Sequence, residues 1–422
     1  NDKRSKIEMN DVFDVNGDFI INSNGEEVGK NLLVRKARGY ISFVKGDNPY
    51  TFPYRIYPQD FDKDKSIKNI PYPKRQLNDK NIIEPLQHSD IYMNNIGDYQ
   101  SIAYDYLISY IKNRKIDIFN DTSPRKEDRF KSLDKFGYTL LQKPIEALNI
   151  IYPIEDLENV VKEGNYSIEP SELIGKNGLN RLMAYTQTNT PNIRNEFYFK
   201  NEKYGNIFSL ENIGNYSSKI KNILDNIINS EGIVMIYSQY IDGGAIPLAL
   251  ALESLGITRQ GNTSNLFKTK PKEDIDYKTF KFKSQLDEPN QFIPAKYIMI
   301  TGDKSISPND LQELKFATDE QNKDGSRVKV IIITQAAAEG LDFKFIRQLH
   351  ILDPWYNMNR IEQIIGRGVR QCSHKNLPLT DRNVQIFLHG TLLKSEKESA
   401  DLYVYRLAEQ KAIQIGKITR IL

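Results

Sequence analysis

The sequence predicts an α/β fold in which a parallel sheet carries helices on both faces, preceded by a mixed α+β segment. Two observations predict it. Between residues 231 and 393, short and nearly continuous apolar runs alternate with segments of helical periodicity, the pattern of strands that are covered on both faces. Before residue 231 the apolar runs are shorter, and turns and charged stretches separate them.

The expected elements follow in chain order. β-type runs occupy 14–21, 39–44 and 48–55, and helices are expected at 99–112 and 217–228, where apolar side chains recur every three or four residues. In the later region we expect strands at 232–237, 297–301, 328–334, 346–352 and 384–388. Helices are expected at 246–255, about 308–316 and about 360–370, the first of them ending at Gly256, a common helix-stop residue.

Composition narrows the class of protein. A length of 422 residues allows two to four domains, and the single cysteine excludes an internal disulfide. Four scattered histidines do not make a zinc site of the usual spacing. The net charge of +3 is small, so a nucleic acid would have to be held by local patches. No apolar run reaches the ~18 residues of a membrane-spanning helix, and we expect no membrane partner.

The most informative segment is 359–370. Asn359 and Glu362 have the spacing of a capping box, which predicts that a helix begins there. One side of that helix is apolar, and the opposite side is polar and carries Gln363, Arg367 and Arg370. The planar guanidinium of arginine suits phosphate oxygens, although two arginines taken alone are more often a solvated basic face.

The strand expected at 328–334 runs directly into a second informative segment, 335–342. Its three alanines and Gly340 let another molecule approach the backbone closely, while Glu339 and Asp342 supply hydrogen-bond acceptors beside it. This loop is a weak signal alone. It becomes a strong one because the helix with Arg367 and Arg370 follows in the same alternation of strands and helices.

The two segments together resemble a known family. Glu339-Gly340-x-Asp342 and Gln363-x-x-Gly366-Arg367-x-x-Arg370 resemble motifs V and VI of superfamily 2 helicases, in the second of their two RecA-like lobes. Segments 350–357, 372–374 and 382–384 are similar to the helicase-type nucleoside triphosphatases of large cytoplasmic DNA viruses. These are the poxvirus-type nucleoside triphosphatase I and early transcription factor group, with relatives in African swine fever virus and giant viruses. The resemblance is specific from about 231 to 415 and looser at 38–46 and 136–153.

The resemblance implies roles for individual residues. Arg367 and Arg370 would be arginine fingers that reach the γ-phosphate of ATP, and Gln363 would sense the nucleotide. Four further residues of motifs V and VI would contact the nucleotide or couple it to the nucleic acid: Glu339, Gly340, Asp342 and Gly366. The ends of the strands would meet the nucleic acid at Thr334, Tyr237, Ser238, Thr301 and Gly302. For the last four residues, an ordinary strand-end turn is an equally open alternative.

The resemblance also implies an organisation. Residues 1–65 would be the end of the first lobe or an interlobe β segment, 66–230 a charged and partly helical interlobe insertion, 231–393 the second RecA-like lobe, and 394–422 the start of a helical C-terminal extension. ATP and Mg²⁺ would be held mainly by the first lobe. The expected partners are that first lobe, DNA with RNA as the alternative, and viral transcription machinery, in the host cytoplasm (viral factory) and the virion.

Two sequence motifs that an ATPase needs are absent from this sequence. No segment reads Gly-x-x-x-x-Gly-Lys-Ser/Thr, and no Asp-Glu pair follows a buried strand. We therefore expect a piece of a longer polypeptide that does not turn over ATP alone, and an ATPase-inactive DNA-binding or partner-binding module is the alternative. Three single residues carry smaller predictions: Lys219 on the surface, Cys372 packed inside, and Trp355 as the anchor of its loop.

Overall fold

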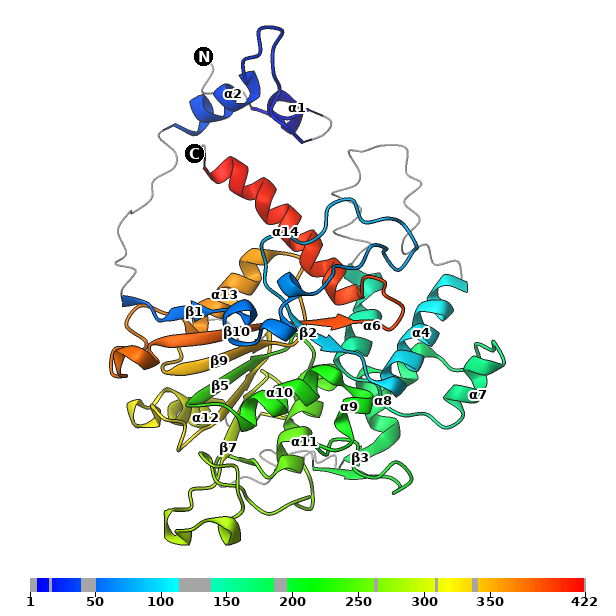
Figure 1. The fold of residues 1–422 in the computed structure, drawn as a ribbon, viewed down its shortest axis with the longest axis vertical. Coiled ribbons are helices and arrows are strands. Elements are labelled where there is room, and N and C mark those ends of the chain that lie inside the picture. Colours follow the sequence, from blue (N-terminus) through cyan, green and yellow to red (C-terminus); the bar gives the residue numbers. More distant parts are fainter. Residues whose placement is uncertain are drawn as a thin grey trace.

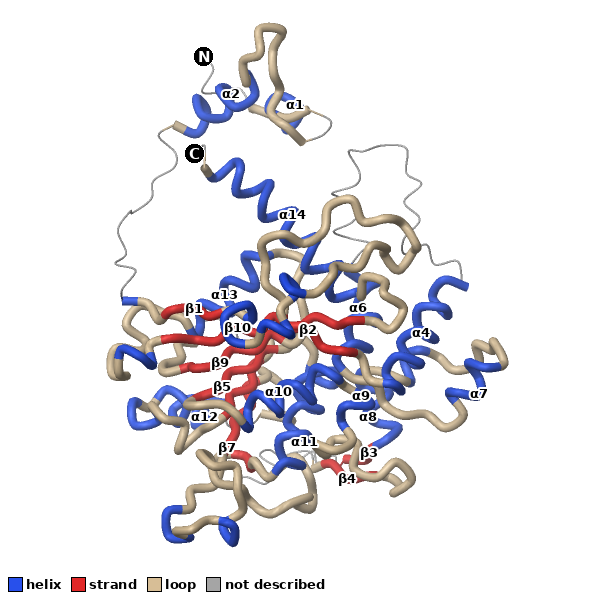
Figure 2. Tube along the Cα trace, viewed as in Figure 1, coloured by secondary structure: helices blue, strands red, loops and turns tan. Residues whose placement is uncertain are grey.

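The computed structural model describes residues 6–14, 17–38, 51–113, 138–185, 196–261, 265–307, 310–335 and 341–420. Within these residues one sheet of eight strands has the order β1-β10-β9-β5-β8-β7-β6, and β2 lies beside the second half of β10. Each of its strand pairs is parallel, and helices lie on both sides of it (Figures 1 and 2). The predicted α/β class, with its RecA-like parallel sheet, is confirmed.

The five strands expected between residues 231 and 393 are all present. The sheet consists of β1 Tyr54–Ile56, β2 Tyr92–Asn95, β5 Ile233–Tyr237, β6 Thr258–Arg259, β7 Lys296–Ile300, β8 Val330–Ile333, β9 Ile346–Ile351 and β10 Asn383–Leu392. A separate antiparallel pair is formed by β3 Met183–Tyr185 and β4 Phe197–Phe199. β10 is longer than the predicted 384–388 because its second half pairs with β2, a strand that sequence reasoning did not find.

Helices fill the connections and cover the faces. They are α1 Met9–Val12, α2 Val28–Ala37, α3 Pro58–Phe61, α4 Asp98–Asn113, α6 Tyr138–Asn149, α7 Leu157–Lys162, α8 Gly175–Leu182, α9 Ile213–Tyr216, α10 Ser218–Ile228, α11 Ile246–Leu255, α12 Asp310–Thr318, α13 Met358–Gly368 and α14 Ala400–Thr419. Gly256 ends α11 with a φ of +109°, as predicted. Among the described residues, no helix combines the length and apolar character that crossing a membrane requires.

The alternation of side chains along each strand builds a core on each face of the sheet. On one face Val234 and Ile236 of β5 pack with α10 and α11. On the other face Ile233 and Met235 pack with α13 and with the first turns of α14. A third apolar cluster joins α4, α6 and α14 at the end of the sheet where β2 lies. The full burial of β5 on both faces explains why its sequence is an unbroken apolar run.

The region before residue 231 differs from the expectation in part. Strands β1 and β2 come from this region and pair with β10, so the sheet extends beyond the segment 231–393. The run at 14–21 does not form a strand; it contributes one isolated bridge between Phe13 and Phe19, flanked by α1 and α2. The run at 39–44 and residues 48–50 lie outside the described residues.

Candidate functional site

The helix that carries the two motif VI arginines is α13. Asn357 is its N-cap, and the side chain of Asn357 accepts a hydrogen bond from the backbone N of Asn359 at 3.0 Å. The predicted capping box at Asn359 and Glu362 is therefore wrong by one half-turn. Asn359 lies inside the helix, and Glu362 instead pairs with Arg55 of β1 at 2.7 Å. The sequence pattern concealed Asn357 because two asparagines stand two residues apart and either can cap a helix.

The two faces of α13 are as predicted. Its apolar side chains are buried against the sheet, namely Ile361, Ile364, Ile365 and the following Val369. Gln363 is exposed on the opposite side, and Arg367 and Arg370 are partly exposed. Both arginines stand at the carboxyl end of the helix, where the partial negative charge of the backbone carbonyls favours cations.

Both guanidinium groups contact the motif V segment. Arg367 Nη1 lies 3.4 Å from the carbonyl oxygen of Leu341, and the backbone N of Phe343 donates to the carbonyl of Arg367 at 3.2 Å. Arg370 Nη1 is 2.5 Å from Asp342 Oδ2, and its Nε donates to the carbonyl of Gly366 at 3.3 Å. The structure thus brings together four of the predicted residues, Arg367, Arg370, Asp342 and Gly366.

The turn that follows α13 is fixed by hydrogen bonds. Ser373 Oγ donates to the carbonyl of Arg370 at 2.9 Å, and His374 Nε2 lies 2.7 Å from the carbonyl of Ile346 on β9. Cys372 adopts a left-handed backbone conformation and donates its N–H to the carbonyl of Thr51. These hydrogen bonds fix the backbone at Arg370, so that only the side chain of Arg370 is free to change its position.

An open cleft of about 570 Å³ lies beside this turn. Its lining includes Arg370, Asp342 and Gly366 among predicted residues, together with Phe52, Phe343, Lys344, Val369, Gln371, Cys372, Ser373 and Lys375. A Cβ at Gly366 would meet no atom of the described chain within 4 Å, so the glycine leaves the helix surface open toward the cleft. The lining is mainly cationic, with Lys344, Arg370 and Lys375 set against Asp342.

The arrangement fits an anionic ligand. The side chains of Arg370 and Asp342 are 42% and 56% exposed, so their ion pair is a solvated one and is worth only ~0.2–1 kcal/mol. The carboxylate of Asp342 stands where a phosphate oxygen would bind the guanidinium, and a multiply charged phosphate would compete well for it. Neither arginine is enclosed in an internal salt bridge, which is the arrangement that would have ruled out a ligand role.

The remaining predicted residues divide into two groups. Glu339 and Gly340 lie outside the described residues. The residues expected at nucleic acid lie where parallel strands end, but the side chains of Tyr237, Ser238, Thr301 and Thr334 are buried. Thr334 Oγ1 donates to the carbonyl of Thr301 at 3.0 Å, and Ser238 Oγ donates to Asp353 at 2.6 Å. Among these five predicted residues, only Gly302 is exposed, with a φ of +75°.

Predictions for three single residues had different outcomes. Trp355 is partly buried against the core, with Arg360 lying 5.0 Å over its ring, as a loop anchor should be. Cys372 was expected inside but is exposed at the cleft. Lys219 was expected on the surface but is completely buried, in an ion pair with Asp401. The signal that could have found Lys219 is its spacing of four residues before Ile223, which places it on the buried face of the amphipathic helix α10.

The site offers cationic groups and backbone, and it does not fit a divalent metal. Among the described residues, no cluster of three or more His, Cys, Asp and Glu side chains could hold a metal ion.

Comparison with known proteins agrees with the geometry. The family described as "Helicase conserved C-terminal domain" matches residues 218–372. A protein of Acanthamoeba polyphaga mimivirus named as an ATP-dependent RNA helicase is 40% identical over 115 residues, covering 25% of this chain and 14% of that protein. Another so named from the same virus is 22% identical over 418 residues, covering 93% of this chain and 33% of that protein.

A further relative is the termination factor NPH-I homolog of African swine fever virus, which is 31% identical over 188 residues. That match covers 42% of this chain and 26% of the relative. The chain thus spans a third or less of the length of these relatives. Residues 218–372 match the helicase conserved C-terminal domain, which is consistent with the C-terminal, second RecA-like lobe of superfamily 2, and the relatives that the chain resembles are helicase-like proteins of large DNA viruses.

Proposed function

We propose that this chain is the part of a nucleic-acid-dependent ATPase that supplies arginine fingers from its second lobe. The observation that carries the proposal is the pair of guanidinium groups at the end of α13, both in contact with residues 341–342 and one of them lining an open cationic cleft. A solvated ion pair to Asp342 holds Arg370 until a phosphate replaces the carboxylate. Gln363, on the same exposed side of α13, would sense the nucleotide.

The chemistry follows from charge. ATP with Mg²⁺, bound mainly by the first lobe, supplies the phosphoryl group that is transferred. Arg367 and Arg370 stabilise the negative charge that develops on that group, and an arginine finger accelerates such a reaction by roughly 10³ to 10⁵. Because the fingers stand on a different lobe from the rest of the site, hydrolysis requires the two lobes to close. Closure and reopening would then move this lobe along a nucleic acid.

The nucleic acid would bind at the carboxyl edge of the parallel sheet, where ligands of open α/β sheets generally bind. Of the residues predicted at this edge, Gly302 and the backbone groups near Thr301 and Thr334 are the candidates, since the side chains of Thr301 and Thr334 are buried. The proposed partner is DNA, with RNA as the alternative, and the proposed setting is viral transcription or replication in the host cytoplasm. The names of the relatives support such a setting: one is a termination factor homolog and two are named as RNA helicases.

Substituting each finger tests the proposal. In a polypeptide that also carries a phosphate loop and a magnesium-binding carboxylate pair, Arg367→Ala or Arg370→Ala should lower kcat for DNA-stimulated ATP hydrolysis by roughly 10³-fold or more. Binding of a duplex oligonucleotide, measured by fluorescence anisotropy, should stay within about threefold of the unsubstituted protein, because the fingers serve the phosphoryl group.

Arg327→Ala is the matched control. Arg327 forms a similar half-exposed ion pair, with Asp319, but it precedes β8 and so lies at the amino edge of the sheet, away from the cleft. Its loss should change neither hydrolysis nor DNA binding. If the Arg367→Ala and Arg370→Ala variants hydrolyse ATP as fast as the Arg327→Ala variant, Arg367 and Arg370 do not act as arginine fingers. The alternative of an ATPase-inactive binding module is then favoured.

A further inference from the structure

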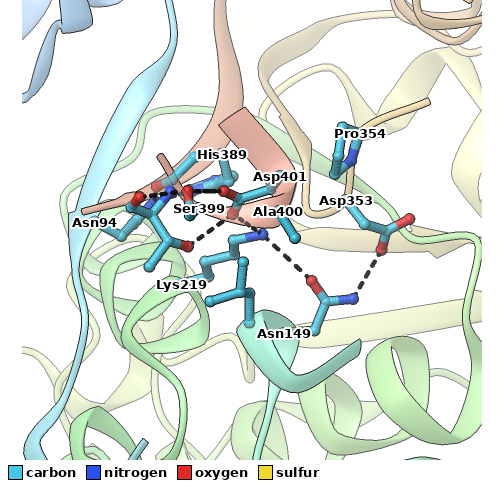
Figure 3. Close-up of polar contacts among 12 residues, drawn as sticks. Asn94, Asn149, Lys219, Asp353, Pro354, His389, Ser399, Ala400 and Asp401 are labelled. Atoms are coloured by element: carbon cyan, nitrogen blue, oxygen red, sulfur yellow. Dashed lines mark hydrogen bonds and ion pairs between the residues drawn. The ribbon is translucent and has the colours of Figure 1, made fainter. Parts of the chain in front are cut away.

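Lys219 is the centre of a buried polar network that the proposed chemistry does not use. It stands in the first turn of α10 and its side chain has no exposed surface. Its Nζ lies 2.9 Å from Asp401 Oδ2, in the first turn of α14. It also donates to the carbonyl of Leu352, directly after β9, at 3.0 Å, and lies 3.4 Å from Asn149 Oδ1 at the end of α6. One ammonium group therefore joins four elements (Figure 3).

The network continues from Asn149 to the loop that leads into α13. Asn149 Nδ2 donates to Asp353 Oδ1 at 3.1 Å, and Ser238 Oγ donates to the same oxygen at 2.6 Å. Asp353 Oδ2 accepts from the backbone N of Gln239 at 2.9 Å, and the side chain of Gln239 reaches the carbonyl of Pro354 at 3.3 Å. Asp353 is thus the residue at which the ends of β5 and β9 and the start of the α13 loop are tied together.

Asp401 is equally enclosed on the other side. It accepts from Thr391 Oγ1 of β10 at 2.7 Å, from Ser399 Oγ at 2.5 Å and from the backbone N of Leu402 at 2.8 Å. α14 then packs along α13, and Leu402 and Tyr405 share an apolar cluster with Ile361 and Ile365. A shift of α14 would therefore reach α13 in two ways, through the apolar packing between the two helices and through the buried ion pair of Asp401 with Lys219.

Stability alone does not account for such a network. Two ions taken out of water gain little or nothing over an apolar pair of the same shape, although removing one partner is strongly destabilising. What a fully satisfied buried network does provide is one defined arrangement, because each alternative arrangement leaves a buried polar group without a partner. The arrangement that is defined here is the position of the 353–357 loop and of α14 relative to α13.

We propose that Lys219 is a positioning residue: through Asp401 on one side and Asn149 and Asp353 on the other, it couples the C-terminal helix α14 to the loop that sets the start of the finger helix α13. The importance of this coupling for hydrolysis rests on the proposed function of Arg367 and Arg370. The coupling itself is a property of the protein without nucleotide and is measured without it.

The chain contains a probe at the right place. Trp355 is the sole tryptophan of the sequence and lies in the 353–357 loop, so its fluorescence reports that loop alone. In Lys219→Met we expect a shifted Trp355 emission maximum. We also expect at least 10-fold faster hydrogen exchange at the Gln239 amide, which is bonded to Asp353, and in the first two turns of α13.

A second buried ion pair supplies the matched control. Arg259 of β6 and Glu313 of α12 form a pair at 3.0 Å whose side chains are 0% and 3% exposed, at the opposite edge of the same sheet. Arg259→Met should speed exchange in β6, β7 and α12 and leave Trp355 emission and α13 exchange unchanged. If both variants change α13 equally, Lys219 acts only through global stability and the proposal is wrong.

A double variant guards against simple unfolding. Lys219→Met with Asp401→Leu removes both charges together, which avoids the uncompensated buried carboxylate of the single variant. We expect it to recover most of the lost resistance to urea while the Trp355 emission and the exchange at Gln239 remain altered. Recovery of the original emission and exchange in this folded variant would overturn the proposal. Because neither readout involves ATP, failure of the finger hypothesis would leave this result standing, and the reverse also holds.

Discussion

At the scale of single residues, two buried histidines make the fold sensitive to acid. His350 Nδ1 lies 3.0 Å from His389 Nε2, and neither side chain has exposed surface. The side-chain amide nitrogen of Asn94 is 3.3 Å from His389 Nδ1, and because that nitrogen can only donate, His389 Nδ1 accepts. His389 then donates to His350, and His350 donates to Gln348 Oε1 at 3.4 Å. This chain of bonds requires both imidazoles to be neutral.

We expect the free energy of unfolding to fall as the pH is lowered below about 6.5. Burial lowers the pKa of His350 to about 3, and burial together with the neighbouring His350 and Lys219 lowers the pKa of His389 well below 6.5. In this window the unfolded chain binds protons that the folded chain does not, so each imidazole lowers stability by about 1.4 kcal/mol per pH unit. Stability is fully present above pH 6.5 and declines toward pH 3.

Urea unfolding at pH 7 and pH 5 measures this effect. His350 should lower the free energy of unfolding by roughly 2 kcal/mol between these values, and His389 should add to the fall in the same direction. His350→Gln should remove roughly 2 kcal/mol of the difference, whereas His88→Gln, at an exposed position, should not change it. An unaltered pH dependence in His350→Gln would mean that groups elsewhere in the chain set the acid sensitivity.

Single residues were predictable where a local pattern carried them. Arg367 and Arg370 were found because a spacing of three residues places two side chains on one helix face, next to a motif. Lys219 was not, because a lone lysine beside two serines looks like a solvated residue. What makes it an interior residue is Asp401, on a helix far along the chain, and no local pattern records that pairing. The burial of Tyr237, Ser238 and Thr334 was hidden for the same reason.

At the scale of the element, α13 contains two glycines whose surroundings differ. Gly366 faces the cleft, where an added Cβ would meet open space. Gly368, the last residue of the helix, faces β9, where a Cβ would stand 3.3 Å from the Cβ of Ile346. The atom of Ile346 that is met lies next to its backbone in a central strand and cannot turn aside. The sequence shows both glycines as helix-weakening residues and does not separate them.

Alanine substitution should therefore have opposite effects at the two positions. Gly366→Ala should stabilise the fold by up to ~1 kcal/mol, the difference in helix propensity between the two residues. Gly368→Ala should destabilise it by ~1 kcal/mol or more, because overpacking against a rigid strand outweighs a propensity gain at the end of a helix. Urea denaturation of the two variants compares them directly. An equal gain in stability from both would contradict the close packing of α13 on β9.

The boundaries of elements show a similar division. Strands β5, β7 and β8 were predicted because their sequences are almost entirely apolar, as expected of strands that are covered on both faces. β2 was missed because its sequence, Tyr92-Met93-Asn94-Asn95, is half polar. Asn94 is nonetheless fully buried, because its side-chain amide donates to the carbonyl of Gly390 on β10 at 2.7 Å. A polar strand of this kind is recognisable only when its partner is known.

At the scale of the whole molecule, the lobe is not closed by the segment 231–393 alone. β10 has β9 on one side, and on the other side it pairs with β1 and β2, both from before residue 100. The face that α10 covers, with Ile220, Ile223 and Leu224 fully buried, also depends on residues before 231. Asp401 of α14, which neutralises Lys219, comes from after 393. The resemblance located the motifs of the lobe, and the structure shows how much more of the chain completes its core.

Truncation tests this dependence. A polypeptide of residues 51–422 should unfold in one cooperative urea transition with a midpoint close to that of residues 1–422, since it keeps the whole sheet and its covering helices. Residues 231–393 should show no such transition. Without α10 they expose one apolar face of the sheet, and without β1 and β2 the backbone of β10 becomes an open edge that pairs with other chains. Trp355 fluorescence and circular dichroism follow unfolding, and light scattering detects the aggregation expected of the shorter piece. A monomeric 231–393 that melts cooperatively would show that the lobe is complete without its flanking segments.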